Sequence, residues 1–163
     1  MSGAVFRPHV LVVSDDPDLS AFLAEGLTYG GFWASVIASA IQTLEVFRLR
    51  GFDLVLVDGG LAGLGALELV RRLRGRSDHA APGVARTDVP IWLVLGHADE
   101  TAAADAHAAG ADGVLTPPLD LEDLAPRLHA IIAVWRAAHP DRLSADELAQ
   151  RRPSGDGWDE SGA

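Results

Sequence analysis

Two short apolar runs of the chain end in carboxylates, the side chains best suited here to bind a cation or act as nucleophiles. They read VLVVSDD over residues 10–16 and LVLVDGG over residues 54–60. Asp15 and Asp58, at adjacent strand ends, can share one hard cation such as Mg²⁺, which prefers oxygen ligands and keeps several waters. The glycines that follow leave the backbone carbonyl of Gly60 free to join them. These residues predict a Mg²⁺ site.

A simpler interpretation stays open for the first of these ends. Asp15 and Asp16 precede Pro17, and an aspartate in this place often caps the free backbone N–H groups of a helix. By themselves the two carboxylates are more often caps than ligands. Asp58 favours the metal interpretation, because it closes an otherwise apolar strand. We expect Asp15 and Asp58 to be ligands, with Asp16 as a further candidate.

The elements that must position these carboxylates alternate between strands and helices. Continuous apolar runs rich in β-branched residues are typical of parallel strands buried on both faces. Such runs, or weaker ones, lie at residues 10–13, 33–37, 54–57, 91–95 and 113–115. Helical patterns separate them, so five β-α units predict a doubly wound α/β fold. In this fold ligands bind beyond the carboxyl ends of the strands.

Composition and charge exclude several classes of function. The chain has 163 residues, a formal net charge of −10 and no cysteine. This charge has the wrong sign for nonspecific binding to nucleic acid. The lack of cysteine excludes disulfides, thiolate catalysis and Cys-based zinc sites. No apolar run approaches the roughly 20 residues of a membrane helix, and no secretory signal is recognisable. We expect a cytoplasmic protein that binds neither nucleic acid nor membranes.

Four segments together resemble the receiver domain of bacterial two-component response regulators. They read VLVVSDDPDL, DLVLVDGGLAGLGALELVRRLR, VPIWLVLG and AGADGVLTPPLDLEDL. The resemblance covers residues 8–136 and implies the flavodoxin-like receiver fold, a five-stranded parallel sheet in the order 2-1-3-4-5. It implies that Asp58 accepts a phosphoryl group from a histidine kinase, with Mg²⁺ held by Asp15, Asp58 and the Gly60 carbonyl. It also implies a cis peptide bond before Pro118.

The sequence departs from the receiver pattern around this site. The first residue of the acidic pair is Ser14, the phosphoryl-binding Ser/Thr is Leu95, the mobile aromatic residue is Val114 and the lysine is Pro117. No shift in register restores the lysine, because all thirteen basic residues are arginines; Arg86, in a loop, is a candidate replacement. Losing one preorganised donor typically lowers a rate by about 10² to 10³. We therefore expect weak or absent Mg²⁺ binding and a degenerate phosphorylation switch.

The combined expectation is a stand-alone atypical receiver in phosphorelay signalling, acting through protein contacts and not as an enzyme. Its partner would be a histidine kinase or another signalling protein. A homodimer would use the face formed by the helix at 100–109, the strand at 113–115 and the helix after Asp120. A conventional receiver phosphorylated on Asp58 is the alternative. Remote alternatives are a flavodoxin-like cofactor domain, which needs a Gly/Ser/Thr-rich first loop, and a cobalamin-type domain suggested by DAHAAG at 105–110.

The remaining segments have structural interpretations. Residues 137–152 contain the capping box Ser144 and Glu147, which predicts a short helix in a C-terminal extension. Residues 153–163 are polar and glycine-rich, which predicts a disordered tail. The arginines at 71, 72, 74 and 76 form either a docking patch or the solvated face of a helix. No output domain fits after the receiver part, so we expect output through protein contacts.

Overall fold

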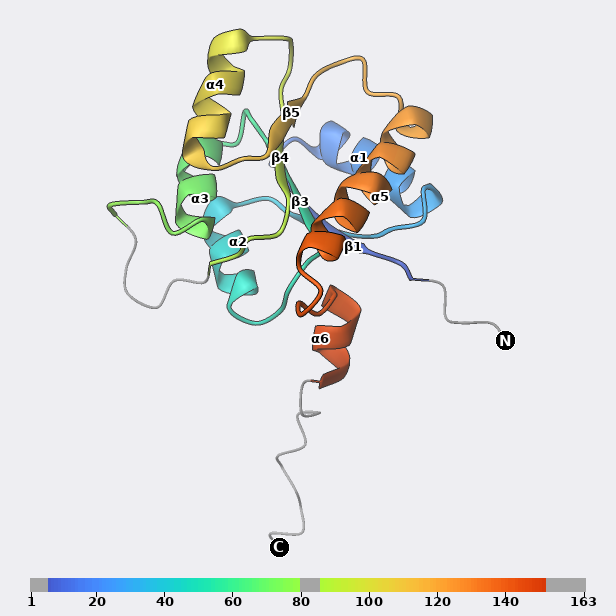
Figure 1. Cartoon of the computed structure of the whole chain (residues 1–163). Coiled ribbons are helices and arrows are strands. Elements are labelled where there is room, and N and C mark those ends of the chain that lie inside the picture. Colours follow the sequence, from blue (N-terminus) through green and yellow to red (C-terminus); the bar gives the residue numbers. More distant parts are fainter. Residues whose placement is uncertain (1–5, 80–85, 152–163) are drawn as a thin grey trace, which may run out of the picture.

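A five-stranded parallel sheet forms the centre of the molecule. The computed structural model describes residues 6–79 and 86–151. The strands are β1 (His9–Val13), β2 (Trp33–Ile37), β3 (Leu54–Asp58), β4 (Ile91–Val94) and β5 (Gly113–Leu115). All their pairings are parallel, and their order is β2-β1-β3-β4-β5 (Figure 1). The predicted fold class and strand order are confirmed.

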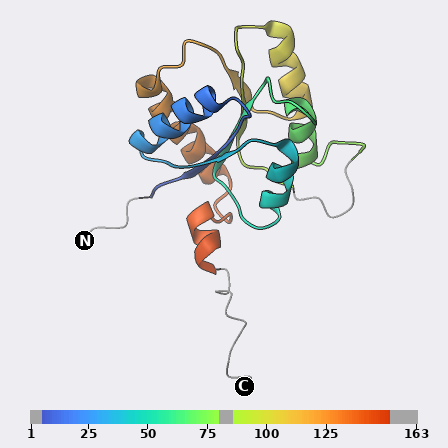
Figure 2. The same ribbon diagram turned by 180° about the vertical axis from the view of Figure 1, so that it is seen from behind.

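Helices cover both faces of this sheet. They are α1 (Pro17–Tyr29), α2 (Ala40–Phe47), α3 (Ala66–Leu73), α4 (Glu100–Ala109), α5 (Leu121–Ala138) and α6 (Ala145–Arg151). Figures 1 and 2 show α1 and α5 on one face, and α2, α3 and α4 on the other. None of the described helices is both long and apolar enough to cross a lipid bilayer.

Alternate residues of each central strand supply two separate apolar cores. In β1, Leu11 and Val13 pack toward α2, α3 and α4, whereas Val10 and Val12 pack toward α1 and α5. All four are at most 1% exposed. Burial on both faces is the reason that the strand sequence is continuously apolar instead of alternating.

The helix starts follow the capping residues of the sequence. Ser39, Asp99 and Asp120 each accept a hydrogen bond from a backbone N–H in the first turn of the helix that follows. Ser144 and Glu147 form a complete capping box, because the Ser144 N–H donates to Glu147 Oε2 and the Glu147 N–H donates to Ser144 Oγ. The predicted short helix in the extension is confirmed as α6. The tail predicted for residues 153–163 lies outside the described residues.

Helix α6 is attached to the edge of the sheet where the strands begin. Asp53, directly before β3, accepts from the His9 N–H at 2.8 Å and from the Ala145 N–H at 3.0 Å. Burial raises the pKa of the Asp53 carboxyl above its ordinary value, while the two hydrogen bonds oppose the rise. This buried aspartate therefore joins the extension to the domain, and it lies at the other end of β3 from Asp58.

Candidate functional site

Asp58 is the last residue of β3, and both oxygens of its carboxylate accept hydrogen bonds. Ser14 Oγ donates to Oδ2 at 2.7 Å, and the Gly60 backbone N–H donates to Oδ1 at 2.8 Å. Ser14 is only 2% exposed, because it follows the buried strand β1 directly. A charged acceptor makes such bonds shorter and stronger than neutral ones. Asp58 is therefore an oriented carboxylate at the carboxyl edge of the sheet.

The two aspartates after β1 have different roles. Asp15 Oδ2 accepts from the Ala62 backbone N–H at 3.2 Å, which ties it to the loop that follows Asp58. Asp16 Oδ1 instead accepts from two backbone N–H groups in the first turn of α1, at 3.0 and 3.3 Å. The cap interpretation is thus confirmed for Asp16. Asp15 and Asp58 lie at the same edge of the sheet, and Ser14, the residue before Asp15, donates a hydrogen bond to Asp58.

The oxygen atoms at this edge are of the kind that Mg²⁺ prefers. Within residues 6–79 and 86–151, no three His, Cys, Asp or Glu side chains gather closely enough to hold a metal. The candidate donors are the carboxylates of Asp15 and Asp58 and the carbonyl of Gly60. Ser14 contributes a neutral hydroxyl where the receiver pattern has a second charge. Mg²⁺ tolerates a site of this kind because it retains several waters.

An apolar side chain lies beside the candidate acceptor. Leu95 directly follows β4, and its N–H donates to the Leu115 carbonyl at 2.8 Å. A Cβ atom on Gly59 would be 3.0 Å from Leu95 Cδ2, so the leucine packs against the residue after Asp58. Its side chain also contacts the core between the sheet and α2, α3 and α4. A group attached to Asp58 on this side would meet hydrocarbon and no hydrogen-bond donor from Leu95.

The two remaining switch positions lie on or after β5. Val114 is partly buried and packs against the same core as Leu95. A valine side chain is short and has one stiff rotatable bond, so it cannot swing between an inner and an outer position as a ring can. The peptide bond between Pro117 and Pro118 is cis, which confirms that prediction. Pro117 supplies no positive charge.

Comparison with known proteins agrees with this geometry. Residues 10–129 match the family model of the response regulator receiver domain. The chain belongs to this family. The receiver is 33% identical over 128 residues to the TorCAD operon transcriptional regulatory protein TorR of Escherichia coli, covering 78% of this chain and 50% of TorR. It is 34% identical over 140 residues to the virulence sensor protein BvgS of Bordetella pertussis, covering 86% of this chain and 11% of BvgS.

Solved structures show the same architecture. A CheY-like receiver domain protein from Methanospirillum hungatei has a TM-score of 0.68 and 21% identity, covering 82% of this chain and 99% of that one. The receiver domain of a Francisella response regulator has a TM-score of 0.66 and 19% identity, covering 78% and 98%. At these identities the likeness supports the fold alone. The receiver spans about half the length of TorR, so the operon control named for TorR belongs to that longer protein.

The structure places Arg86 far from the acceptor of this receiver. Arg86 precedes β4, so it lies at the edge where the parallel strands begin, and Asp58 lies at the edge where they end. Its guanidinium packs against Gly75, and it lines a cavity of about 280 Å³ together with Phe52 and Trp135. Arg86, the candidate replacement for the missing lysine, is therefore not positioned to reach Asp58.

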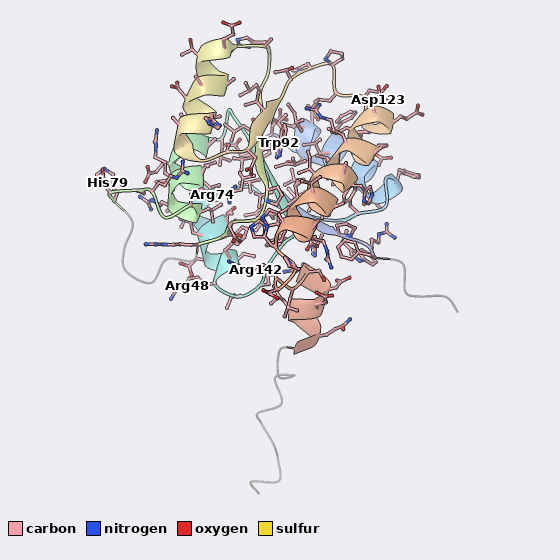
Figure 3. All side chains as sticks on the ribbon, viewed as in Figure 1. Arg48, Arg74, His79, Trp92, Asp123 and Arg142 are labelled. Atoms are coloured by element: carbon pink, nitrogen blue, oxygen red, sulfur yellow. The ribbon has the colours of Figure 1, made fainter. Side chains whose placement is uncertain are left out.

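Arg74 has a role that the sequence did not indicate. Its Nε donates to the Gly110 carbonyl at 2.9 Å, and its Nη1 donates to the carbonyls of Thr87 and Val89 at 2.9 and 2.8 Å. Its Nη2 pairs with Asp112 Oδ2 at 2.8 Å. Arg74 thus joins the end of α3 to the segments that lead into β4 and β5 (Figure 3). It belongs neither to a docking patch nor to a solvated face. Its partners are mostly backbone carbonyls, which leave no signal in a sequence.

Proposed function

We propose that this receiver is an atypical member of two-component phosphorelay signalling whose output does not depend on phosphorylation of Asp58. The main support is the position of Leu95, an apolar side chain that packs beside Gly59 where the receiver pattern has a hydroxyl. Val114 and Pro117 add the loss of the mobile ring and of the ammonium group. The acceptor remains, but the groups that would sense its modification are absent.

Phosphoryl transfer to Asp58 would proceed by in-line attack of a carboxylate oxygen on the phosphorus of a kinase phosphohistidine, whose P–N bond breaks as the imidazole leaves. A bound Mg²⁺ supplies neutralisation of the developing charge. Asp15, Asp58 and the Gly60 carbonyl would hold that ion. Ser14 Oγ donates a hydrogen bond to Asp58 Oδ2. Attack by Oδ2 on phosphorus therefore requires the Ser14 hydroxyl either to move away or to donate to the lone pair of Oδ2 that does not attack. We expect slow phosphorylation for this reason and because two donors are missing.

Coupling from the site to the surface is expected to be weaker than the acceptor chemistry. A ligand shifts an equilibrium between two states only by its differential affinity for them. A phosphoryl group gains no hydrogen bond by drawing Leu95 inward, and it gains no ion pair from Pro117. The face formed by α4, β5 and α5 would then have one conformation whether or not Asp58 is modified.

This face is the proposed contact surface for a signalling partner, a histidine kinase or a second copy of the receiver. The outer side of α4 carries the exposed alanines Ala104 and Ala108, which permit close approach of another backbone. On the neighbouring strand, Trp92 lies beneath the guanidinium of Arg127, 5.5 Å from the ring centroid. We place this contact function in the cytoplasm and propose no catalytic activity for the receiver.

The alternative is a conventional receiver in which Mg²⁺ and phosphorylation of Asp58 rearrange the same face. The two functions are distinguished by amide chemical-shift mapping with Mg²⁺ and beryllofluoride, which stands in for the phosphoryl group. Our proposal predicts shifts confined to the loops around Asp15 and Asp58. The Asp58→Asn variant with the same additives is the control. Shifts that spread through residues 100–125 of the wild type, and vanish in the variant, would overturn the proposal.

A further inference from the structure

The strand at one edge of the sheet, β2, has an open side and no charged residue. It reads WASVI, and within the described residues it pairs with β1 alone. Trp33 is 50% exposed and Val36 is 43% exposed. Soluble proteins commonly protect such an edge with lysines, prolines or bulges, because its unpaired backbone groups attract other strands. The sequence of β2 and its continuous register with β1 contain none of these features.

Two residues of β2 direct their backbone groups toward the open side. The ladder with β1 starts at the Trp33 N–H, which donates to the Pro8 carbonyl at 2.8 Å. In a parallel ladder every second residue of a strand bonds to the same neighbour, so Ser35 also faces β1. The N–H and C=O groups of Ala34 and Val36 therefore point away from β1. No residue that the structure describes forms a hydrogen bond with these four groups.

A second copy of β2, in antiparallel orientation, matches all four groups. With a twofold axis at Ser35, Ala34 of each copy lies opposite Val36 of the other. Each such pair exchanges two hydrogen bonds, so the two pairs give four bonds and leave no edge group of either strand unpaired. The same register places Trp33 opposite Ile37 of the second copy, and pairs of an aromatic and a β-branched residue stabilise antiparallel sheets. The strand is thus complementary to itself.

The helix beside this edge, α1, has a small and uncharged flank. α1 packs on β1 and β2, and α5 packs against it at Gly26 and Gly30, where an added Cβ atom would overlap side chains of α5. Residues on the opposite flank follow from the rotation of 100° per residue, and they are Ala21, Ala24 and Thr28. This flank lies toward the open edge, so a second copy of α1 can approach it closely.

Charges on the segments that flank β2 nearly cancel. Three are acidic and two are basic: Asp18, Glu25, Glu45, Arg7 and Arg48. The Arg7 guanidinium lies 4.4 Å from the centroid of the Trp33 ring, and its Nη2 donates to the last turn of α1 at 3.0 Å. Arg48 contacts Glu45 at 3.8 Å. Although the whole chain has a net charge of −10, two copies can approach along this edge with little repulsion, which salt screens further.

We propose that two copies of the receiver pair through β2, antiparallel around Ser35, and form one continuous sheet of ten strands. Main-chain hydrogen bonds supply the affinity, and the Trp33 and Ile37 pairs fix the register. The contact is isologous and uses both β2 edges, so it closes at two copies and does not grow into a fibre. It lies at the opposite edge of the sheet from β5, and it requires neither the face of α4, β5 and α5 nor phosphorylation of Asp58.

The test is amide hydrogen exchange of the full chain at increasing protein concentration, with sedimentation of the same samples. We expect a dimer to form, and exchange at Ala34 and Val36 to slow about tenfold or more between about 10 µM and 1 mM. Exchange at Ser35 should change much less, because its N–H already faces β1. A strict monomer at 1 mM, or a dimer with unchanged exchange at Ala34 and Val36, would overturn the proposal. Protection of both amides at every concentration would indicate a cover within one chain and would overturn it too.

Two variants locate the contact. Ala34→Pro removes an outward N–H and leaves the ladder with β1 intact. It should weaken the dimer about tenfold or more, because two of the four bonds are lost. Val36→Lys adds a charge to the edge and should weaken the dimer as strongly, which keeps the test independent of the folding of the proline variant.

The matched control is Val134→Lys, at a valine of α5 that is 71% exposed. It should leave the dimer unchanged, and circular dichroism checks that each variant is folded. Loss of the dimer in Val134→Lys but not in Val36→Lys would move the contact to α5 and overturn the proposal.

Discussion

Replacing Arg74, the residue directly after α3, with alanine should destabilise the receiver more than replacing Arg71 or Arg72 within that helix. The Arg74 side chain is 11% exposed and makes four hydrogen bonds, three of them to backbone carbonyls. Hydrogen bonds with a charged partner contribute about 1.5–3 kcal/mol each, but they are not additive, and the carbonyls can bind water once the side chain is gone. Asp112 is 49% exposed, so its ion pair contributes at most about 1 kcal/mol.

These contributions predict a loss of about 2–4 kcal/mol in the free energy of unfolding for Arg74→Ala, less than the sum of the bonds, because they are not additive and the freed carbonyls can be hydrated. That is a large fraction of the 5–15 kcal/mol typical of a domain. Burial lowers the pKa of Arg74, with Asp112 opposing, but arginine stays protonated at any pH of the experiment. Arg74→Lys keeps the charge without the planar fork, so we expect an intermediate loss.

The assay is urea denaturation followed by circular dichroism, with the m-value compared between variants. Arg71→Ala is the matched control, because Arg71 is 42% exposed and has only a 3.7 Å contact with Glu68; its loss should cost at most about 0.5 kcal/mol. A loss below about 1 kcal/mol for Arg74→Ala, or equal losses for both variants, would refute the assignment of Arg74 as the residue that joins α3 to β4 and β5.

Two further predictions concern pH and the switch. Burial, and then the charge of Arg50, lower the pKa of His9 to about 4 from its ordinary 6.5. The unfolded chain therefore takes up this proton first, so stability is full above pH 6.5 and falls between pH 6.5 and 4, by about 1–2 kcal/mol after allowance for partial exposure. Urea denaturation of wild type and His9→Gln over this range checks the prediction, which fails if their stability difference is independent of pH. Leu95→Thr combined with Pro117→Lys should raise labelling of Asp58 by acetyl phosphate and Mg²⁺ about 10²-fold or more, measured by Phos-tag mobility with Asp58→Asn as the blank; unchanged labelling would show that other groups limit the reaction.

The sequence by itself determined the architecture. Continuous apolar strands are readable because burial on both faces leaves residues 10–13 of β1 and 54–57 of β3 entirely apolar, and most helix starts are readable because capping is local. Ser144 and Glu147 of the capping box are three positions apart, so its chemistry is contained in the sequence and α6 follows from it. The departures at Leu95, Val114 and Pro117 are likewise properties of residue type and position. No tertiary contact is needed to know that the hydroxyl, the ring and the ammonium are missing.

Only the tertiary structure decided which side chains meet. Asp15 and Asp16 are adjacent and chemically identical, and the sequence left both open as ligands. The direction of α1 turns Asp16 into a cap and leaves Asp15 facing the loop of the acceptor. Asp53 and Asp58 close opposite ends of the same strand, and the position of α6 makes one of them a structural anchor. The roles of Arg74 and Arg86 were also decided by the tertiary structure. The packing of parallel strands brings the backbone carbonyls that Arg74 binds close to it, although they lie far along the chain. Residue type alone does not encode this proximity.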